Sequence, residues 1–398
     1  MFLDALIRRN RPFVEAAIEL HQRGEIPANS FVIDVDAVES NARLFAEAAA
    51  AHGLWTLAMT KQVGRNPRFL RAVVDGGIEA FVAVDMADAR RIHATGHHVG
   101  HVGHLVQVPR SETATAAAIA PDYWTVYSLD KAQEAAEASA AAGREQPLLA
   151  RIFAEGDIFY PGHEGGFPAE AVARVADDLD QLDGARFAGL TTFPALLFDH
   201  QSGEVQTTPN LSTLERAAEA LRGHGRGDIE INAPGTTSSE VLPLLAAAGA
   251  TQVEPGHGLT GTTPLHAVRD LPERPAVLYL SEVSHLHAGR AYAFGGGMYI
   301  DAVFPPYQVN AVVGSDPEQA LADRVPAELP LPAAIDYYGM LDPPPGHPVA
   351  TGDTVIFGFR IQAFVTRAFV VPVPGVESGS AHTDGIWTAD GTPVALDE

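Results

Sequence analysis

The chain has 398 residues, a formal net charge of −24 and no cysteine. An acidic chain lacks the basic face that nucleic acid and anionic membranes require, and a chain without cysteine can form no disulfide, thiolate metal site or cysteine nucleophile. No uninterrupted apolar run reaches the roughly 18 to 20 residues of a membrane span, and the N-terminal segment shows no signal peptide. We therefore expect a cytoplasmic protein that acts on a small molecule.

Strand and helix patterns alternate along most of the chain. After two predicted N-terminal helices, residues 31–36 show the period of two that is typical of a strand, and an alanine-rich helix follows at 38–51. From residue 55 onward, short apolar runs recur between helical stretches such as 130–142 and 211–221. These runs lie at 55–59, 80–84, 102–108, 123–126, 148–153, 187–191, 229–231 and 252–254.

This rhythm indicates the fold class. About eight β-α units over roughly 200 residues predict a (β/α)8 TIM barrel, and a doubly wound parallel sheet is the alternative architecture. From about residue 270 helical periodicity ends, which predicts a C-terminal all-β domain. Its strands are predicted at 276–281, 299–304, 308–313, 354–359 and 363–373. The predicted domains are N-terminal helices with a leading strand at 1–54, the barrel at 55–268 and the β-domain at 269–398.

Lysine is rare in this chain. Lys61 and Lys131 are the only lysines among 26 lysine and arginine residues. Lys131 lies in the first turn of a predicted helix, where a solvated lysine is ordinary, whereas Lys61 follows the first barrel strand. Active sites of barrels lie at the carboxyl ends of the strands, and an amine can form a Schiff base while a guanidinium stays charged. Lys61 is therefore a candidate catalytic residue, with a surface lysine at a loop start as the alternative.

The end of the eighth predicted strand carries a carboxylate and a glycine loop. Gly256, Gly258 and Gly261 have the spacing G-x-G-x-x-G, which follows the last β-α unit and so suits a phosphate cradle better than a dinucleotide site. Residues 232–238 add hydroxyls and a glycine turn, or simply a helix N-cap. Glu254 fits beside a phosphate if it faces a cation such as a protonated pyridine nitrogen, and a structural ion pair is the alternative. Pyridoxal 5′-phosphate combines an aldehyde, a phosphate and such a ring nitrogen.

Five histidines cluster in the sequence IHATGHHVGHVGHLV. Zinc or manganese is conceivable, but the spacing matches no standard metal motif and the run lacks carboxylates, so we predict no metal site. We place His104 within the third strand, near its active-site end, where it can line a pocket or stack on a ring. The other histidines are expected in loops.

These residues resemble those of the alanine-racemase-like, fold-type III enzymes that use pyridoxal phosphate. The shared features are Lys61 after the first strand, the strand–helix start FVAVDMADARR, the EPG of the eighth strand and the following β-domain. Nearly the whole chain is similar to the YhfX-like group within them, through FVIDVDAV, MTKQVGRNP, GHLVQVP, NAPGTTS, EPGHGLTGT and a GGG segment. The resemblance implies pyridoxal 5′-phosphate as cofactor, an amino-acid substrate, and a head-to-tail homodimer with its active site at the subunit interface.

The resemblance also implies roles for individual residues. Lys61 would hold the cofactor as a Schiff base, and the backbone N–H groups of Gly256 and His257 would bind its phosphate. Glu254 stands at the place facing the pyridine nitrogen, where alanine racemase has arginine and the basic-amino-acid decarboxylases have glutamate. The full cofactor-binding set is Lys61, His104, Asn232, Gly235, Thr236, Glu254, Gly256 and His257.

The second catalytic base departs from the family pattern. Alanine racemase uses a tyrosine of the β-domain, and Phe294 holds the comparable place here. Phenylalanine cannot move a proton, so Tyr292 and Tyr337 are the predicted catalytic tyrosines, with Tyr338 as a substitute. Arg290 is a candidate for binding the substrate carboxylate.

The leading hypothesis is a pyridoxal-phosphate enzyme that abstracts the α-proton of an amino acid, as a racemase or epimerase. Lys61 would be one base and a tyrosine from the partner subunit the other. A decarboxylase or lyase is favoured by Glu254 but lacks the cysteine of the known decarboxylases. A non-catalytic pyridoxal-phosphate-binding protein usually lacks the β-domain, and a metal- or NAD-dependent barrel leaves Lys61 and Glu254 unexplained.

Overall fold

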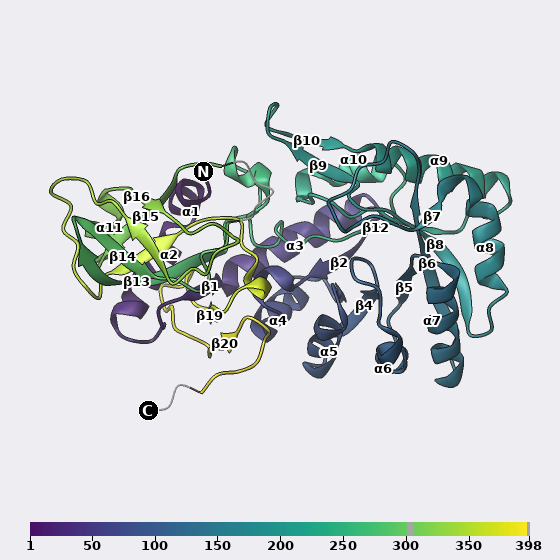
Figure 1. Ribbon diagram of the computed structural model, residues 1–398, viewed down its shortest axis with the longest axis horizontal. Helices are drawn as coiled ribbons and strands as arrows, with labels where there is room; N and C mark the ends of the chain where they lie inside the picture. The colour runs from purple at the N-terminus through teal and green to yellow at the C-terminus, as the bar shows by residue number, and fades with distance from the viewer. Residues whose placement is uncertain (301–305, 396–398) are drawn as a thin grey trace. The chain divides into compact units, whose positions relative to one another are not determined.

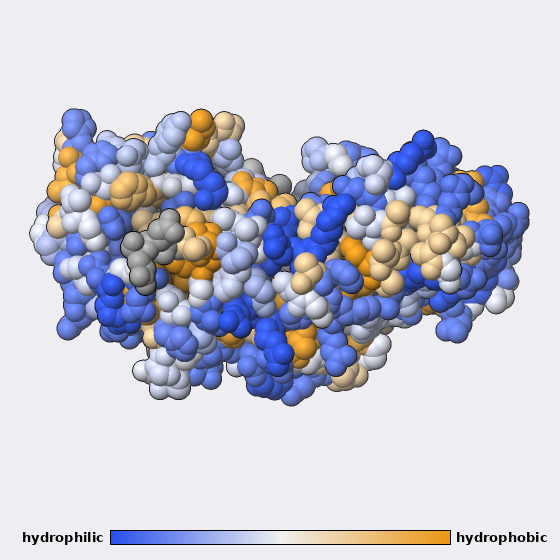
Figure 2. Space-filling model, turned by 90° about the horizontal axis from the view of Figure 1, so that it is seen from below, coloured by the Kyte–Doolittle hydropathy of each residue, from blue (hydrophilic) through white to orange (hydrophobic). Residues whose placement is uncertain are grey.

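The computed structural model describes residues 1–300 and 306–395. The chain divides into two compact units, and each is described by itself. The barrel unit consists of Arg43–Thr60 and Gly77–Gly256, and the β-sheet unit consists of Met1–Ala42, Lys61–Gly76 and His257–Glu398. Hydrophilic side chains cover most of the face shown in Figure 2, in keeping with the net charge of −24. In the described residues, no helix is long and apolar enough to cross a membrane.

The barrel unit is built on parallel strands that close into a ring (Figure 1). The order runs β2-β3-β4-β5-β6-β8-β11-β12, and β12 pairs again with β2. The strands are β2 (Trp55–Met59), β3 (Ala80–Val82), β4 (His98–Val102), β5 (Tyr123–Val126), β6 (Gln146–Phe153), β8 (Ala185–Thr191), β11 (Glu230–Asn232) and β12 (Gln252–Val253). The predicted (β/α)8 barrel is confirmed.

Helices alternate with these strands along the chain. They are α5 (Met86–Ala94), α6 (Thr113–Ile119), α7 (Leu129–Ala141), α8 (Val172–Asp180), α9 (Pro209–Gly223) and α10 (Leu242–Ala247). In α7, the Ser128 hydroxyl accepts the N–H of Lys131 as an N-cap, and Ala132, Ala135 and Ala136 are buried on one face. These small side chains let α7 pack closely on the strands. Short strands complete the unit: β7 (Phe167–Pro168) on β6, and the hairpin of β9 (Leu196–Asp199) and β10 (Glu204–Thr207).

The β-sheet unit contains a nine-stranded, mostly antiparallel sheet in the order β14-β17-β16-β15-β18-β13-β1-β19-β20. The strands are β1 (Ser30–Asp34), β13 (Val277–His287), β14 (Arg290–Phe294), β15 (Val309–Gly314), β16 (Val325–Glu328), β17 (Tyr338–Leu341), β18 (Thr354–Phe357), β19 (Phe369–Val373) and β20 (Trp387–Thr388). The predicted C-terminal all-β domain is confirmed. Its sheet also includes β1, which pairs antiparallel with β13 and parallel with β19.

The N-terminal helices supply much of the core of this sheet. The helices of the unit are α1 (Phe2–Arg9), α2 (Arg11–Gln22), α4 (Pro67–Asp75) and α11 (Pro317–Ala322), and α3 (Val35–Ala51) contains the division between the two units. Phe13 and Ile18 of α2 are buried against Val32, Leu278 and Ile356 of the sheet. Burying such side chains contributes roughly 1.5–3 kcal/mol each, so α2 is an integral part of this unit.

Some predicted elements differ from the structure. The third barrel strand, predicted at 102–108, ends at Val102, because Gly103 adopts a φ of +78° and a Cβ there would lie 2.5 Å from the carbonyl oxygen of Thr125. The placement of His104 within a strand was therefore wrong. Of the strand predicted at 299–304, the first two residues lie in no strand, and 301–305 lie outside the described residues. Strands β14, β16, β17 and β20 were not predicted.

Candidate functional site

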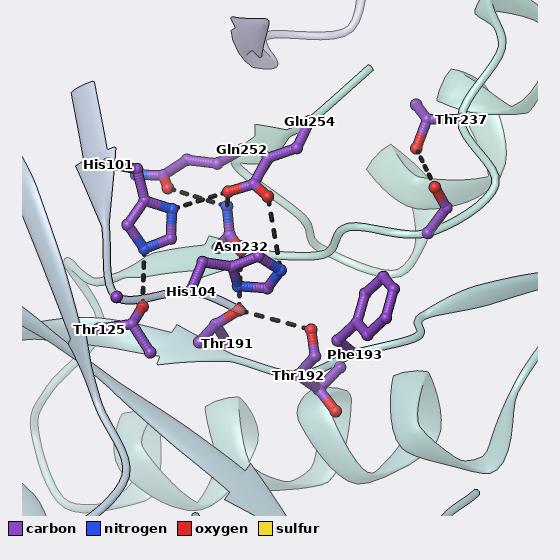
Figure 3. Close-up of polar contacts among 12 residues, drawn as sticks. His101, His104, Thr125, Thr191, Thr192, Phe193, Asn232, Thr237, Gln252 and Glu254 are labelled. Atoms are coloured by element: carbon purple, nitrogen blue, oxygen red, sulfur yellow. Dashed lines mark hydrogen bonds and ion pairs between the residues drawn. The ribbon is translucent and has the colours of Figure 1, made fainter. Parts of the chain in front are cut away.

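Polar side chains gather where several barrel strands end (Figure 3). Glu254 directly follows β12, Asn232 is the last residue of β11, and Thr191 is the last residue of β8. His101 lies in β4, and His104 follows two residues after that strand. The carboxyl ends of parallel barrel strands open at one mouth, which is where barrel enzymes carry their catalytic groups.

The carboxylate of Glu254 is the centre of this cluster. Its Oε1 lies 2.7 Å from Nδ1 of His101 and accepts a hydrogen bond from Nδ2 of Asn232 at 3.0 Å. Its Oε2 lies 3.5 Å from Nε2 of His104. The side chains of Glu254, His101 and His104 are at most 1% exposed. The structure thus brings together three of the predicted cofactor-binding residues and adds His101, which the sequence had assigned to a loop.

Glu254 keeps its charge in this setting. Burial alone would raise the pKa of its carboxyl, but the charge of His104 and the hydrogen bonds from His101 and Asn232 outweigh burial and hold the pKa below its ordinary value. A buried carboxylate of this kind is stable only because cationic and polar groups surround it. The site therefore presents a fixed negative charge.

A second layer of contacts orients Asn232. The Thr191 hydroxyl donates to Asn232 Oδ1 at 2.7 Å, and Asn232 Nδ2 also lies 3.3 Å from Gln252 Oε1. The side-chain oxygen is thereby identified as the acceptor and the nitrogen as the donor, so Asn232 directs its N–H toward Glu254.

Several buried polar atoms around this mouth lack a hydrogen-bond partner among residues 1–300 and 306–395. They include Oε2 of Glu254, Oγ1 of Thr192, Oγ of Ser238 and Nε2 of Gln252. Buried polar groups are nearly always hydrogen-bonded, so such atoms point to a ligand. Ser238 belongs to the segment 232–238, whose hydroxyls the sequence offers beside the predicted phosphate site. Thr192 was not predicted as a site residue, and the available signal was a hydroxyl directly after a barrel strand.

The turn after β11 contains Gly235 and Thr236. A Cβ on Gly235 would lie 2.6 Å from the backbone nitrogen of Leu196, so only glycine fits this close approach. The N–H of Thr236 donates to the carbonyl of Leu196 at 3.2 Å. The Thr237 hydroxyl closes the turn onto the carbonyl of Gly235 at 3.2 Å (Figure 3).

A buried arginine in β6 was missed by the sequence analysis. Arg151 is fully buried, and its guanidinium donates to Tyr127 Oη at 2.9 Å and to the carbonyls of His163 at 2.8 Å and Phe193 at 3.2 Å. Tyr127 in turn donates to the carbonyl of His104 at 2.7 Å. Burial lowers the pKa of Arg151. The signal was a single arginine inside the apolar run LLARIF.

Lys61 and His257 belong to the β-sheet unit. Lys61 comes two residues after β2 and begins the 3-10 turn Lys61–Val63, with its Nζ 5.8 Å from the centre of the Phe364 ring. The Nε2 of His257 lies 2.8 Å from the carbonyl oxygen of Ile361. Burial, together with the charge of Arg360, holds the pKa of His257 well below its ordinary value, so the ring is neutral and donates from Nε2. Gly256, immediately before it, is the last residue of the barrel unit.

The predicted tyrosines lie on an aromatic cluster of the β-sheet unit. Tyr292 of β14 stacks on His285 with ring centres 4.6 Å apart, and Tyr338 lies within 6.5 Å of Tyr292. Tyr337 is 66% exposed. Arg290 is held by the carboxylates of Glu328 at 3.0 Å and Asp342 at 2.8 Å. It is therefore already paired within its own unit.

Within the described part of the chain, one group of three or more metal-ligating side chains is close enough to share an ion. It is His101, His104 and Glu254, whose donor atoms lie within 4.8 Å of one another. Two histidines and a carboxylate can bind a divalent metal, so this cluster is also where an ion would compete with an organic cofactor.

This chain is similar to known proteins in both of its units. Residues 33–264 match the family described as alanine racemase, N-terminal domain, and residues 278–383 match the one described as YhfX-like, C-terminal domain. A protein of Escherichia coli (strain K12), described as uncharacterized protein YhfX, is 39% identical over 394 residues, covering 99% of this chain and 100% of that protein.

Solved structures with much lower identity share the fold. D-threonine aldolase from Filomicrobium marinum has a TM-score of 0.68 at 18% identity, over 92% of this chain and 95% of its own. D-threo-3-hydroxyaspartate dehydratase from Delftia sp. HT23 has a TM-score of 0.65 at 17% identity, over 92% of this chain and 97% of its own. Alanine racemase of Clostridium difficile 630, in complex with cycloserine, has a TM-score of 0.63 at 14% identity, over 92% of this chain and 99% of its own. The chain therefore belongs to the alanine racemase N-terminal domain family, with a YhfX-like C-terminal domain, in the fold-type III group whose cofactor is pyridoxal 5′-phosphate.

Proposed function

We propose that this protein is a pyridoxal-phosphate enzyme that removes the α-proton of an amino acid, of the racemase or epimerase type. The observation that carries the cofactor assignment is Glu254, a buried and ionised carboxylate whose Oε2 lies 3.5 Å from His104 and receives no hydrogen bond among the described residues. When bound, pyridoxal phosphate supplies an aldehyde for an amino group and a protonated ring that accepts electron density from the α-carbon.

The barrel mouth fits this cofactor on three counts. Glu254 Oε2 is an acceptor for a protonated ring nitrogen, and a carboxylate there stabilises the positive charge of that nitrogen. The buried hydroxyls of Thr192 and Ser238 are donors that suit anionic oxygens. The turn at Gly235 follows β11, the seventh strand of the barrel, and barrels commonly bind phosphate in the loops after strands seven and eight.

The roles of individual residues follow from this proposal. The amine of Lys61 would hold the cofactor through its aldehyde and, once displaced by the amino group of the substrate, would move the α-proton on one face of the substrate. The backbone N–H groups of Gly256 and His257 bind the phosphate, together with Gly235 and Thr236. Three residues of the predicted set remain: Glu254 faces the ring nitrogen, Asn232 holds Glu254, and His104 borders the cofactor ring.

A tyrosine of the C-terminal sheet supplies the second base. Tyr292 and Tyr337 are the candidates, and in a head-to-tail homodimer either one acts on the active site of the other copy. A small-molecule amino acid as substrate and residence in the cytoplasm stay predictions of the same kind. A sedimentation experiment that finds a fully active monomer would rule out the dimer.

The assignment is tested by reconstitution. Protein incubated with pyridoxal phosphate is expected to absorb near ~420 nm, and borohydride is expected to fix the label on Lys61. Mass spectrometry of the labelled peptide identifies the site. A protein that binds no cofactor, or a Lys61→Ala variant with full colour and label, would contradict the proposal.

A lyase or decarboxylase is the second candidate, because two structural relatives are named an aldolase and a dehydratase and because a carboxylate stands at the ring position. Hydrogen exchange in D₂O across a panel of L- and D-amino acids separates the reactions. Exchange with inversion indicates a racemase, and release of an aldehyde, of ammonia with a keto acid, or of CO₂ indicates the alternatives. Cofactor binding without any of these indicates a non-catalytic binding protein.

A further inference from the structure

His101 links the buried carboxylate of Glu254 to the neighbouring strand β5 (Figure 3). Its Nδ1 lies 2.7 Å from Glu254 Oε1, and its Nε2 lies 2.6 Å from the hydroxyl of Thr125. An ionised carboxylate can only accept hydrogen bonds, so Nδ1 carries a proton and donates it to Glu254. Both ring nitrogens are thus engaged, and the residue has no exposed surface.

The backbone of β4 fixes where this ring lies. Phe81 faces Val99 across the β3–β4 pair, but Val82 faces His101, so Gly100 is an extra residue on β4. A bulge of this kind re-aims the side chain that follows it. A Cβ on Gly100 would lie 2.4 Å from Cδ2 of Leu57, so a larger residue there would displace that side chain. The position of His101 is therefore fixed by the bulge in the backbone of β4 and by the two hydrogen bonds of its ring.

The contacts to Glu254 are unequal on its two oxygens. His101 and Asn232 both donate to Oε1, whereas in the described part of the chain Oε2 receives no hydrogen bond and lies 3.5 Å from His104 Nε2. Two donors on one oxygen fix the plane of a carboxylate and leave the second oxygen with a fixed direction. Such a carboxylate is prepared for a single additional donor.

We propose that His101 is a positioning residue: braced by Thr125, it orients Glu254 so that Oε2 receives the protonated ring nitrogen of pyridoxal phosphate. This inference rests on the proposed function. Without the His101 donor, only Asn232 still donates to Oε1, so the plane of the Glu254 carboxylate is no longer fixed. An Oε2 that points away from the ring nitrogen no longer stabilises a proton there.

The experiment follows the ring nitrogen directly. Apoprotein is reconstituted with pyridoxal phosphate carrying ¹⁵N in the ring, and the nitrogen shift is measured near neutral pH. The wild-type resonance is expected in the pyridinium range. In His101→Phe the resonance is expected to move toward the range of neutral pyridine. The dissociation constant of the cofactor is expected to rise roughly tenfold, which corresponds to the loss of about one charge-assisted hydrogen bond. His101→Asn places an amide donor near the position of Nδ1 and is expected to restore the wild-type shift.

The matched control is His98→Phe, which changes a histidine of the same strand that pairs instead with Asp122 on the surface. It is expected to leave the shift and the affinity unchanged. Thr125→Val removes only the brace and is expected to move the resonance in the same direction as His101→Phe, by less. Melting of each apoprotein checks folding, and if His101→Phe does not fold, Thr125→Val decides.

An unchanged ¹⁵N shift in folded His101→Phe, or in Thr125→Val where His101→Phe fails to fold, overturns the positioning role. A shift that moves equally in His98→Phe also overturns it. In these cases wild-type protein still binds the cofactor, so the proposed function stands. A wild-type protein that binds no pyridoxal phosphate overturns the proposed function and this inference together.

Discussion

The barrel mouth and the C-terminal sheet keep their reactive side chains under opposite conditions. Glu254, His101 and Arg151 are buried, and each is held by neighbours at short distances. Tyr337 and Tyr338 are 66% and 38% exposed, and the ring of Tyr338 contacts those of His285 and Phe294. Groups that set a charge benefit from a fixed, dry environment, whereas groups that exchange protons with a substrate need access. The two regions therefore respond differently to mutation.

Lys61 provides the largest expected effect. Lys61→Ala is expected to abolish borohydride labelling and to lower turnover by at least about a thousandfold, because the covalent step loses its amine. Lys131→Ala is the matched control, since Lys131 donates to the carbonyl of Val108 and to Glu134 on the barrel surface helix. The control is expected to label fully. Equal labelling of Lys61→Ala and Lys131→Ala would contradict the assignment, because the amine that reacts with the aldehyde would then not be that of Lys61.

The candidate tyrosines of the β-sheet unit are expected to matter for rate and little for stability. Tyr292→Phe or Tyr337→Phe is expected to slow proton exchange by about a hundredfold in whichever residue acts as base, with stability unchanged within about 0.5 kcal/mol. Tyr279→Phe is the opposite case: Tyr279 is buried, its pKa is raised by burial, and its hydroxyl donates to Asn29. That variant is expected to lose about 1 kcal/mol of stability and keep its rate. Full activity in both Tyr292→Phe and Tyr337→Phe would show that neither tyrosine is the second base.

The two arginines sharpen the contrast on the stability side. Arg151→Lys is expected to lower the free energy of unfolding by about 2 kcal/mol. The planar guanidinium reaches three acceptors at once, whereas the single nitrogen of a lysine cannot. Arg290→Lys is expected to change it by less than about 0.5 kcal/mol, since its partners are exposed carboxylates. Denaturant unfolding of both variants measures the difference. Similar losses would mean that burial of Arg151 adds nothing to its contacts.

The smallest expected effect is a change in slope with pH. The pKa of Glu254 is held below its ordinary value, so its ionisation stabilises the folded state above the unfolded pKa of about 4.3, and this contribution is lost as the pH falls through the lower, folded value. Wild-type protein is thus expected to lose stability on acidification more steeply than Glu254→Gln. Glu328→Gln, at an exposed carboxylate, serves as the control. Parallel curves for wild type and Glu254→Gln would show that the buried charge is not linked to folding.

The parts of the site that could be predicted are those that follow apolar strands directly. Lys61 and Glu254 follow the carboxyl ends of β2 and β12, and the alternation of strand and helix patterns along the sequence was enough to locate both strand ends. His101 could not be found this way, because the register shift at Gly100 changes the phase of β4 and alternation in the sequence does not show a bulge. Arg151 was visible as a charge in an apolar run, but its partners come from loops distant in sequence.

The fold was predictable for the same reason and to the same extent. Each barrel strand pairs with a neighbour from the adjacent β-α unit, so the pattern is local. The β-sheet unit depends on long-range pairing, as between β1 and β19, and short strands such as β16 and β20 gain their definition only from partners. Apolar periodicity carries no information about such partners.

The place of β1 has a consequence for synthesis of the chain. Both partners of β1, β13 and β19, emerge from the ribosome only after the whole barrel sequence has been made. Domains generally fold as units during translation, so the barrel can close while the first strand still waits with unpaired edges and the apolar face of α2 uncovered. Strand β1 and helix α2 thus precede the barrel in the chain, yet they gain their sheet partners only after the barrel sequence has been made.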